Sequence, residues 1–207
     1  MANRLLVIGR RLVASPHSDS DMNEVSAAAT PTDSFHIERC DEPGHLPDLV
    51  ESVARRFGEL DMLDLYDHGD VGQLRMGRDV LFRSDDSPGS ELLGRDIAIA
   101  LAPFLRDTAH VRLLGCKTAA ITASVTSLPA LSGRLLLLKL ARALGGHRVA
   151  FGTIASIQRG DFSRFGFRRE REEMRLFSSL AAVDHMPPSY DDRGRHIDAV
   201  RLGTINA

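Results

Sequence analysis

Apolar residues along this chain recur with two periods, one typical of buried β-strands and the other of amphipathic helices. Short apolar runs bounded by glycine or polar residues predict strands over 4–9, 35–40, 60–67, 111–115 and 148–153. Apolar residues at i, i+3, i+4 and i+7 predict helices over 46–57, 92–105, 133–144 and 170–183. Two short apolar pieces on either side of Gly77 predict a small hairpin within 72–82, and a last edge strand is expected around 197–202.

Strands that alternate with helices are typical of an α/β domain with a mostly parallel sheet. Right-handed crossovers then place helices on both faces of that sheet. The 207 residues suffice for one domain with a substantial core. Two segments, 10–34 and 117–131, show no period and are rich in small polar residues. Because irregular segments of that length are usually functional or disordered, we expect both to be mobile loops.

Charge and composition narrow the classes of partner. The formal net charge of −2 provides no basic face, so we expect no nucleic-acid partner. No apolar run approaches the roughly 20 residues that a transmembrane helix needs, so we expect no membrane association. Cys40 and Cys116 are the only cysteines, which is too few for a disulfide framework and favours a reducing, cytoplasmic compartment.

The sequence favours neither a metal site nor a nucleotide cofactor. Its 8 histidines form no H-x-x-x-H pair, and the cysteines are not paired at a ligand spacing. The first predicted strand runs into Gly9-Arg10-Arg11 without the G-x-G-x-x-G spacing of a phosphate-binding loop. Any catalytic chemistry is therefore expected to come from side chains without a metal or a cofactor.

Two predicted strands end in residues that together form a nucleophilic pair. The strand over 60–67 leads into His68-Gly69, and the strand over 111–115 leads into Cys116. If the strands are parallel neighbours, the imidazole and the thiol lie at the same carboxyl edge, where ligands of open α/β sheets bind. A histidine can take the thiol proton and later protonate a leaving amine. The alternatives are that Cys116 is a small buried hydrophobe and that His68-Gly69 is an ordinary turn.

These motifs resemble the caspase-like cysteine peptidases of clan CD, and most closely their bacterial branches, including the CHAT (caspase HetF-associated) type. The similarity rests on His-Gly after one strand, the Leu-Arg-Met-Gly hairpin, Gly-Cys-Lys-Thr-Ala after a later strand, and the helix and strand over 133–153. It covers roughly residues 60–155. The resemblance implies a caspase-like three-layer α/β/α sandwich, with the whole of 1–207 as a single peptidase domain. It also implies that Cys116 is the nucleophile, that His68 is the base and acid, and that the amides of Gly69 and Cys116 form the oxyanion hole.

The sequence gives a weaker indication of the substrate preference, because the residues before Cys116 differ from those of the family. Leu113-Leu114-Gly115 replaces the Gln-Ala that precedes the cysteine in eukaryotic caspases, and Leu114 replaces the Asp of relatives that cut after Arg or Lys. Arg10 and Arg11 follow the first strand, where caspases place an arginine that reads an acidic P1 residue, although two surface arginines would look the same. Asp70 favours a basic residue instead, while Ser156 and Asp161 lie where a pocket wall is expected.

The sequence therefore predicts a cysteine endopeptidase that cleaves a partner protein and prefers an acidic P1 residue. The alternative is a catalytically silent caspase-like module that binds a protein. A regulatory protein partner is compatible with both hypotheses.

Overall fold

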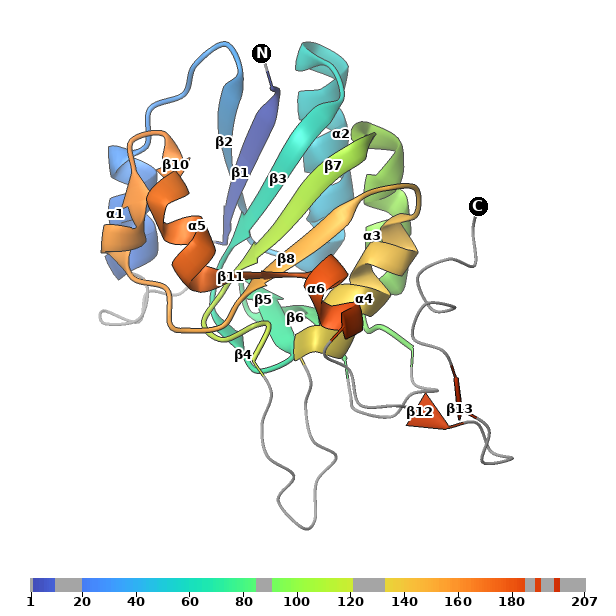
Figure 1. Cartoon of the computed structure of the whole chain (residues 1–207). Helices are drawn as coiled ribbons and strands as arrows, with labels where there is room; N and C mark the ends of the chain where they lie inside the picture. The colour runs from blue at the N-terminus through green and yellow to red at the C-terminus, as the bar shows by residue number, and fades with distance from the viewer. Residues whose placement is uncertain are drawn as a thin grey trace.

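A six-stranded, mostly parallel sheet forms the centre of the molecule (Figure 1). The computed structural model describes residues 2–9, 20–84, 91–120, 133–184, 189–190 and 196–197. The strands lie in the order β11-β8-β7-β3-β1-β2, and all neighbours are parallel except β11, which pairs antiparallel with β8. Their bounds are β1 (Arg4–Gly9), β2 (Phe35–Cys40), β3 (Leu60–Tyr66), β7 (Leu105–Leu114), β8 (Val149–Thr153) and β11 (Leu176–Ser178).

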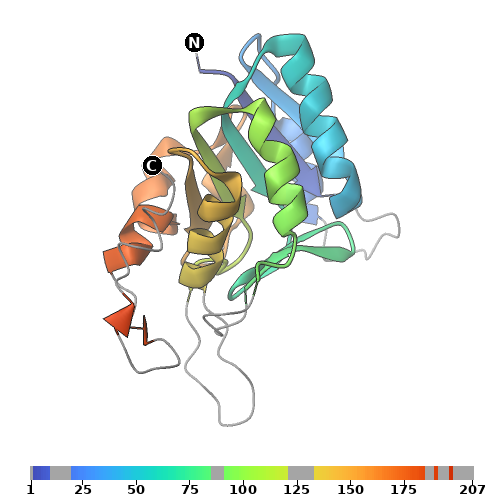
Figure 2. The ribbon, with the colours of Figure 1, turned by 90° about the vertical axis from the view of Figure 1, so that its right-hand side faces the viewer.

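Helices cover both faces of this sheet. One face is packed by α2 (Leu46–Phe57), α3 (Arg95–Leu101) and α4 (Gly133–Leu144), with η1 (Pro43–His45) and η2 (Ala102–Phe104) at helix ends. The other is covered by α1 (Ser20–Ala28), η3 (Arg159–Asp161), the hairpin β9 (Phe162–Ser163) and β10 (Gly166–Phe167), and α5 (Arg169–Arg175). Figure 2 shows the sheet between α5 on one side and α2 and α3 on the other. α6 (Ser179–Asp184) packs on α4 beside the β8–β11 edge.

Alternation along each strand divides the core into two clusters. In β1, Leu5 and Val7 pack toward α2 and its neighbours, whereas Leu6 and Ile8 pack toward α1 and the β9–β10 hairpin. Successive side chains of a strand point to opposite faces, so a strand buried on both sides must be apolar at nearly every position. This requirement explains why the strands read as continuous apolar runs in the sequence.

Six of the expected elements are confirmed at their bounds or within one residue: β1, β2, α2, β3, β8 and α4. The hairpin β5 (Gln73–Met76)–β6 (Asp79–Arg83) is also present. The expected loop over 10–34 is wrong in part, because α1 occupies Ser20–Ala28 and buries Met22 and Val25. Residues 10–19 and 121–132 lie outside the described residues.

The expected helix over 170–183 is also wrong, because the segment folds as α5, β11 and α6. Leu176–Ser178 pairs with the outer edge of β8, and those backbone hydrogen bonds replace the helical ones. Similarly, the helix expected over 92–105 shortens to Arg95–Leu101, and Leu105 already begins β7. The 155–168 segment contains η3 and the β9–β10 hairpin instead of an open loop.

In the tail, β12 (Ser189–Tyr190) pairs with β13 (His196–Ile197) rather than with the central sheet. Residues 198–202, where the rest of the expected edge strand falls, lie outside the described part of the chain.

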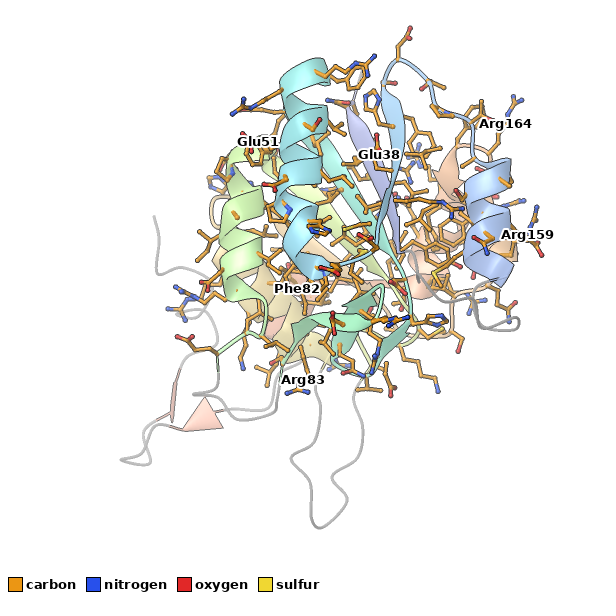
Figure 3. The ribbon with its side chains drawn as sticks, turned by 180° about the vertical axis from the view of Figure 1, so that it is seen from behind. Glu38, Glu51, Phe82, Arg83, Arg159 and Arg164 are labelled. Atoms are coloured by element: carbon orange, nitrogen blue, oxygen red, sulfur yellow. The ribbon has the colours of Figure 1, made fainter. Side chains whose placement is uncertain are left out.

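The topology determines which edge can bind a ligand. β2 lies on one side of β1, while β3, β7 and β8 follow on the other, so the direction of winding reverses between β1 and β3. Ligands of such sheets bind at the carboxyl ends of the strands around this reversal. The three-stranded sheet of β4 (Gly69–Asp70), β5 and β6 lies at the same end (Figure 1). Seen from behind, Phe82 of β6 lies at the foot of α2 and anchors this small sheet in the core (Figure 3).

No helix within the described ranges is long and apolar enough to cross a membrane.

Candidate functional site

The parallel pairing of β3 with β7 brings His68 and Cys116 to equivalent positions. Tyr66 and Leu114 are direct partners at the ends of these strands. His68 and Cys116 follow their strands at the same distance along the chain, two residues beyond that pair. The expected juxtaposition at one edge of the sheet is therefore present in the backbone, and it does not depend on side-chain conformation.

The two segments touch through a pair of glycines. A Cβ built on Gly69 would lie 2.8 Å from the Cα of Gly115 and 2.9 Å from the amide nitrogen of Cys116. In the other direction, a Cβ on Gly115 would lie 2.8 Å from the Cα of Gly69. Real Cβ atoms do not approach so closely, so both positions require glycine for a steric reason. The bare Cα atoms let the histidine-bearing and cysteine-bearing turns lie in direct contact.

Cys116 occupies a half-buried turn that backbone hydrogen bonds hold in place. Its Sγ lies 4.0 Å from the carbonyl oxygen of Ile157, in the segment that follows β8. The next residue, Lys117, has a φ of 56°, a left-handed conformation that is uncommon outside glycine. Its amide donates to the carbonyl of Ala155 at 3.1 Å. Such strain persists only where the surroundings over-determine it, and it concentrates at functional sites.

Two buried threonines lie beneath this turn. The hydroxyl of Thr118 donates to the carbonyl of Leu113 at 3.0 Å, and the hydroxyl of Thr153 donates to the carbonyl of Gly115. The two hydroxyl oxygens are 3.3 Å apart, and both side chains are fully buried. A satisfied buried network of this kind is rigid, so the chain on both sides of Cys116 is fixed to the end of β8. Residues 117–120 of the segment expected to be mobile are therefore hydrogen-bonded, contrary to that prediction.

Hydrogen bonds hold the backbone of His68 at both its amide and its carbonyl. Its carbonyl accepts the amide of Arg75 in β5 at 2.9 Å, and its amide donates to the carboxylate of the preceding Asp67. His68 as a whole is half-buried. The hairpin thus fixes the histidine backbone, while β3 fixes its place along the sheet edge.

The second cysteine is a useful contrast. Cys40 ends β2 with its side chain buried, and its Sγ donates to the carbonyl of Glu42 at 3.1 Å. Burial disfavours the thiolate and raises the pKa of Cys40 to about 11. A thiol of that pKa is almost entirely protonated at neutral pH and is a poor nucleophile.

The residues predicted for substrate binding differ in their exposure to solvent. Asp70 is exposed beside Gly69 and accepts the amide of Val71, and Ser156 is exposed after β8. Leu114 is fully buried among core residues. Asp161 is buried too: its carboxylate accepts the amide of Gln158 at 2.9 Å and lies 3.5 Å from Nε of Arg175. Because Leu114 and Asp161 are buried, the substrate-binding role expected for them is not supported. Arg10 and Arg11 lie outside the described residues.

Sequence reasoning missed an ion network in the middle of the sheet. Asp64 of β3 is fully buried; Arg112 of β7 donates to both of its carboxylate oxygens, and Arg4 of β1 donates to Oδ2. Arg112 also donates to Glu172 of α5 at 2.5 Å. Burial disfavours the charged form of Asp64, but the two guanidinium groups outweigh it and hold the pKa of the carboxyl below its usual range. The signal in the sequence is a charged residue next to strongly apolar neighbours: Arg4 precedes Leu5 and Leu6, Asp64 lies between Leu63 and Leu65, and Arg112 lies between Val111 and Leu113.

The described residues contain no cluster of three or more histidine, cysteine or acidic side chains that could hold a metal ion. What the site offers is a thiol, an imidazole and two turns joined by glycine contacts.

No family model, no curated protein and no solved structure matches this chain.

Proposed function

We propose that this protein is a caspase-like cysteine endopeptidase in which Cys116 is the nucleophile and His68 is the general base and acid. The observation that carries the proposal is the contact between Gly69 and Gly115, which joins the His68 turn to the Cys116 turn at the carboxyl edge of the sheet. A half-buried thiol on a strained, hydrogen-bonded turn adds to it. The sequence similarity to the caspase-like peptidases agrees with this arrangement.

The first half of the reaction forms an acyl-enzyme. His68 takes the proton of Cys116, and the thiolate attacks the carbonyl carbon of the scissile peptide bond. Negative charge moves to the carbonyl oxygen, which accepts hydrogen bonds from the amides of Gly69 and Cys116 in this proposal. The tetrahedral intermediate collapses, the C–N bond breaks, and the imidazolium gives its proton to the leaving amine.

The second half releases the product and restores the thiol. His68 takes a proton from a water molecule, which attacks the thioester carbonyl. The C–S bond breaks, the carboxylate product leaves, and the proton returns to the cysteine sulfur. Each half uses the same imidazole and the same pair of amides, so one preorganised edge of the sheet serves both.

The substrate we propose is a segment of a partner protein with an acidic P1 residue. Charge selection needs a partner for the substrate charge, because burying it unpaired would cost several kcal/mol. β1 ends at Gly9, which packs on Asp67 beside His68, so β1 and β3 reach this edge together. Arg10 and Arg11 follow Gly9 in the sequence and are our candidates for reading an acidic side chain in a bidentate pair.

The test separates the peptidase from a silent binding module. A proteome-derived peptide library is incubated with the wild-type protein and with Cys116→Ala, and new termini are identified by mass spectrometry. We expect cleavage by the wild type only, with the circular dichroism spectra of the two proteins superimposable. If folded wild-type protein cleaves nothing while its Cys116 alkylates no faster than a model thiol, the silent module is the better hypothesis.

The dyad is tested separately by alkylation. With iodoacetamide near neutral pH, replacing His68 by Ala should slow modification of Cys116 on the order of tenfold, because the thiol loses the base that takes its proton. An unchanged rate would remove His68 from the mechanism.

A further inference from the structure

Asp67 is a buried acid in direct contact with the histidine segment. It follows β3, its side chain is only 3% exposed, and it immediately precedes His68. One carboxylate oxygen accepts the amide of His68, and the other accepts the amide of Gly77 at 2.6 Å. A single side chain thus joins the end of a central strand, the histidine and the turn of the β5–β6 hairpin.

The end of β1 closes over the same carboxylate. A Cβ built on Gly9 would lie 1.7 Å from Oδ2 of Asp67 and 2.3 Å from its Cγ, so the carboxylate occupies the space that any side chain at position 9 would need. Gly77, on the other side, has a φ of 64°, the left-handed conformation of a tight turn. Two positions that require glycine therefore shape the site of this carboxylate.

We propose that Asp67 is a positioning residue for His68, which sets the orientation of the histidine toward Cys116 and ties it to the hairpin. This inference rests on the proposed function, since it assigns a role through the dyad. The carboxylate fixes the peptide unit between Asp67 and His68, and the Arg75 amide fixes the unit that follows. With both units held, the backbone of His68 is fixed next to the Gly69–Gly115 contact.

The charge of Asp67 adds to the geometry. A carboxylate buried next to a histidine stabilises the imidazolium that forms when the thiol gives up its proton. The hydrogen bonds it accepts come from the backbone amides of His68 and Gly77. The same charge disfavours the thiolate of Cys40, whose pKa is raised to about 11, chiefly by burial and to a lesser extent by nearby acids that include Asp67.

The test is a double-mutant cycle read by alkylation of Cys116 near neutral pH. Asp67→Asn keeps the shape of the side chain but loses its charge and one acceptor for the Gly77 amide. We expect it to slow alkylation roughly tenfold in the presence of His68 and to have no effect in a His68→Ala background, because the residue acts through the imidazole. Asp67→Ser, which is smaller and can accept the His68 amide, is the second variant and should show the same dependence on His68 if the Asn variant does not fold.

Asp64→Asn is the matched control, because it removes another buried carboxylate from the same strand without touching the dyad. It should lower the midpoint of urea unfolding and leave the Cys116 alkylation rate unchanged. Equal slowing by the Asp67 variants with and without His68 would overturn the positioning role and leave the peptidase proposal intact. If Cys116 is alkylated at the same rate in the wild type and in His68→Ala, the peptidase proposal is overturned and this inference with it.

Discussion

At the residue scale, the two cysteines of this chain differ in burial and in the structure around each sulfur. Cys40 is buried at the end of β2, donates to a carbonyl and has a raised pKa, whereas Cys116 is half-buried on a turn beside the histidine segment. Reactivity follows the thiolate fraction and access to reagent. The environment of each sulfur, and not the residue type, therefore separates the candidate nucleophile from a packing residue.

The first prediction is that iodoacetamide modifies Cys116 well before Cys40 in the folded protein. Cys40 should react appreciably only above about pH 10 or after unfolding, since its pKa is raised to about 11. Peptide mapping by mass spectrometry after timed quenching gives both rates from one sample. Comparable rates for the two thiols in 6 M urea control for reagent access, and comparable rates in the native protein would contradict the prediction.

The second prediction concerns the P1 residue. Among peptides that differ only at P1, as Asp, Arg, Leu or Gly, we expect the Asp peptide to have the highest kcat/KM. Replacing Arg10 and Arg11 by Gln should remove that preference, because the substrate carboxylate loses its partner. A preference for Arg would point to Asp70 instead, and a preference for Leu or Gly would mean that neither charge is read.

At the element scale, the site is a product of how strand ends are joined. β3 and β7 supply the register, the β5–β6 hairpin holds the carbonyl of His68, and the end of β8 holds the Cys116 turn through Thr153. Each contribution is strand pairing or a hydrogen bond to a backbone carbonyl. A change in one element is therefore transmitted to the dyad without altering either side chain.

The third prediction follows from the glycine contact. In Gly69→Ala the added methyl would lie 2.8 Å from the Gly115 Cα and 2.7 Å from Cγ2 of Thr118, so the two turns must separate. Because small displacements of reacting groups are costly, we expect peptidase activity to fall at least about 100-fold. Thermal unfolding should show a destabilisation of about 1–3 kcal/mol, typical of overpacking.

Gly44→Ala is the control for that change, since a Cβ on Gly44 meets no heavy atom within 4 Å. Activity and stability of this variant should stay close to the wild type. Full activity of Gly69→Ala would mean that the close contact is not needed for catalysis.

At the scale of the whole molecule, the sheet is held across three strands by charge as well as by apolar packing. Asp64 lies between Arg112 and Arg4, and Arg112 extends the network to α5 through Glu172. Arg4 and Arg112 also lie over the rings of Phe35 and Phe167. A buried network is costly to break, because removal of one member leaves the others desolvated and unpaired.

The fourth prediction is that Asp64→Asn lowers the free energy of unfolding by about 3 kcal/mol near pH 7. The folded-state pKa of Asp64 is lowered, so its contribution is fully present above its unfolded pKa of about 3.9 and is lost as pH falls through the folded value. Urea unfolding curves at pH 7 and below pH 4 should therefore show the gap between wild type and variant narrowing in acid. A constant gap would mean that the network contributes through shape and not through charge.

The local sequence by itself determined the elements whose hydrophobic period is unambiguous and the two strand ends that carry His68 and Cys116. α2, α4, β1 and β2 follow from runs and spacings that only one secondary structure can bury. His68 and Cys116 were recognisable because each follows the end of a predicted strand. These signals are local: they need no knowledge of which strand neighbours which.

Tertiary structure decided everything that depends on partners distant in the chain. Leu176–Ser178 became a strand because β8 offered an open edge, and Ser20–Ala28 became a helix because the far face of the sheet needed apolar cover from Met22 and Val25. Asp64 with Arg112, and Asp67 with Gly9 and Gly77, are separated along the chain and meet only through strand register and the hairpin. Local periodicity carries no record of such pairings, because the free energy that selects them comes from burial and hydrogen bonds that exist only once the sheet has formed.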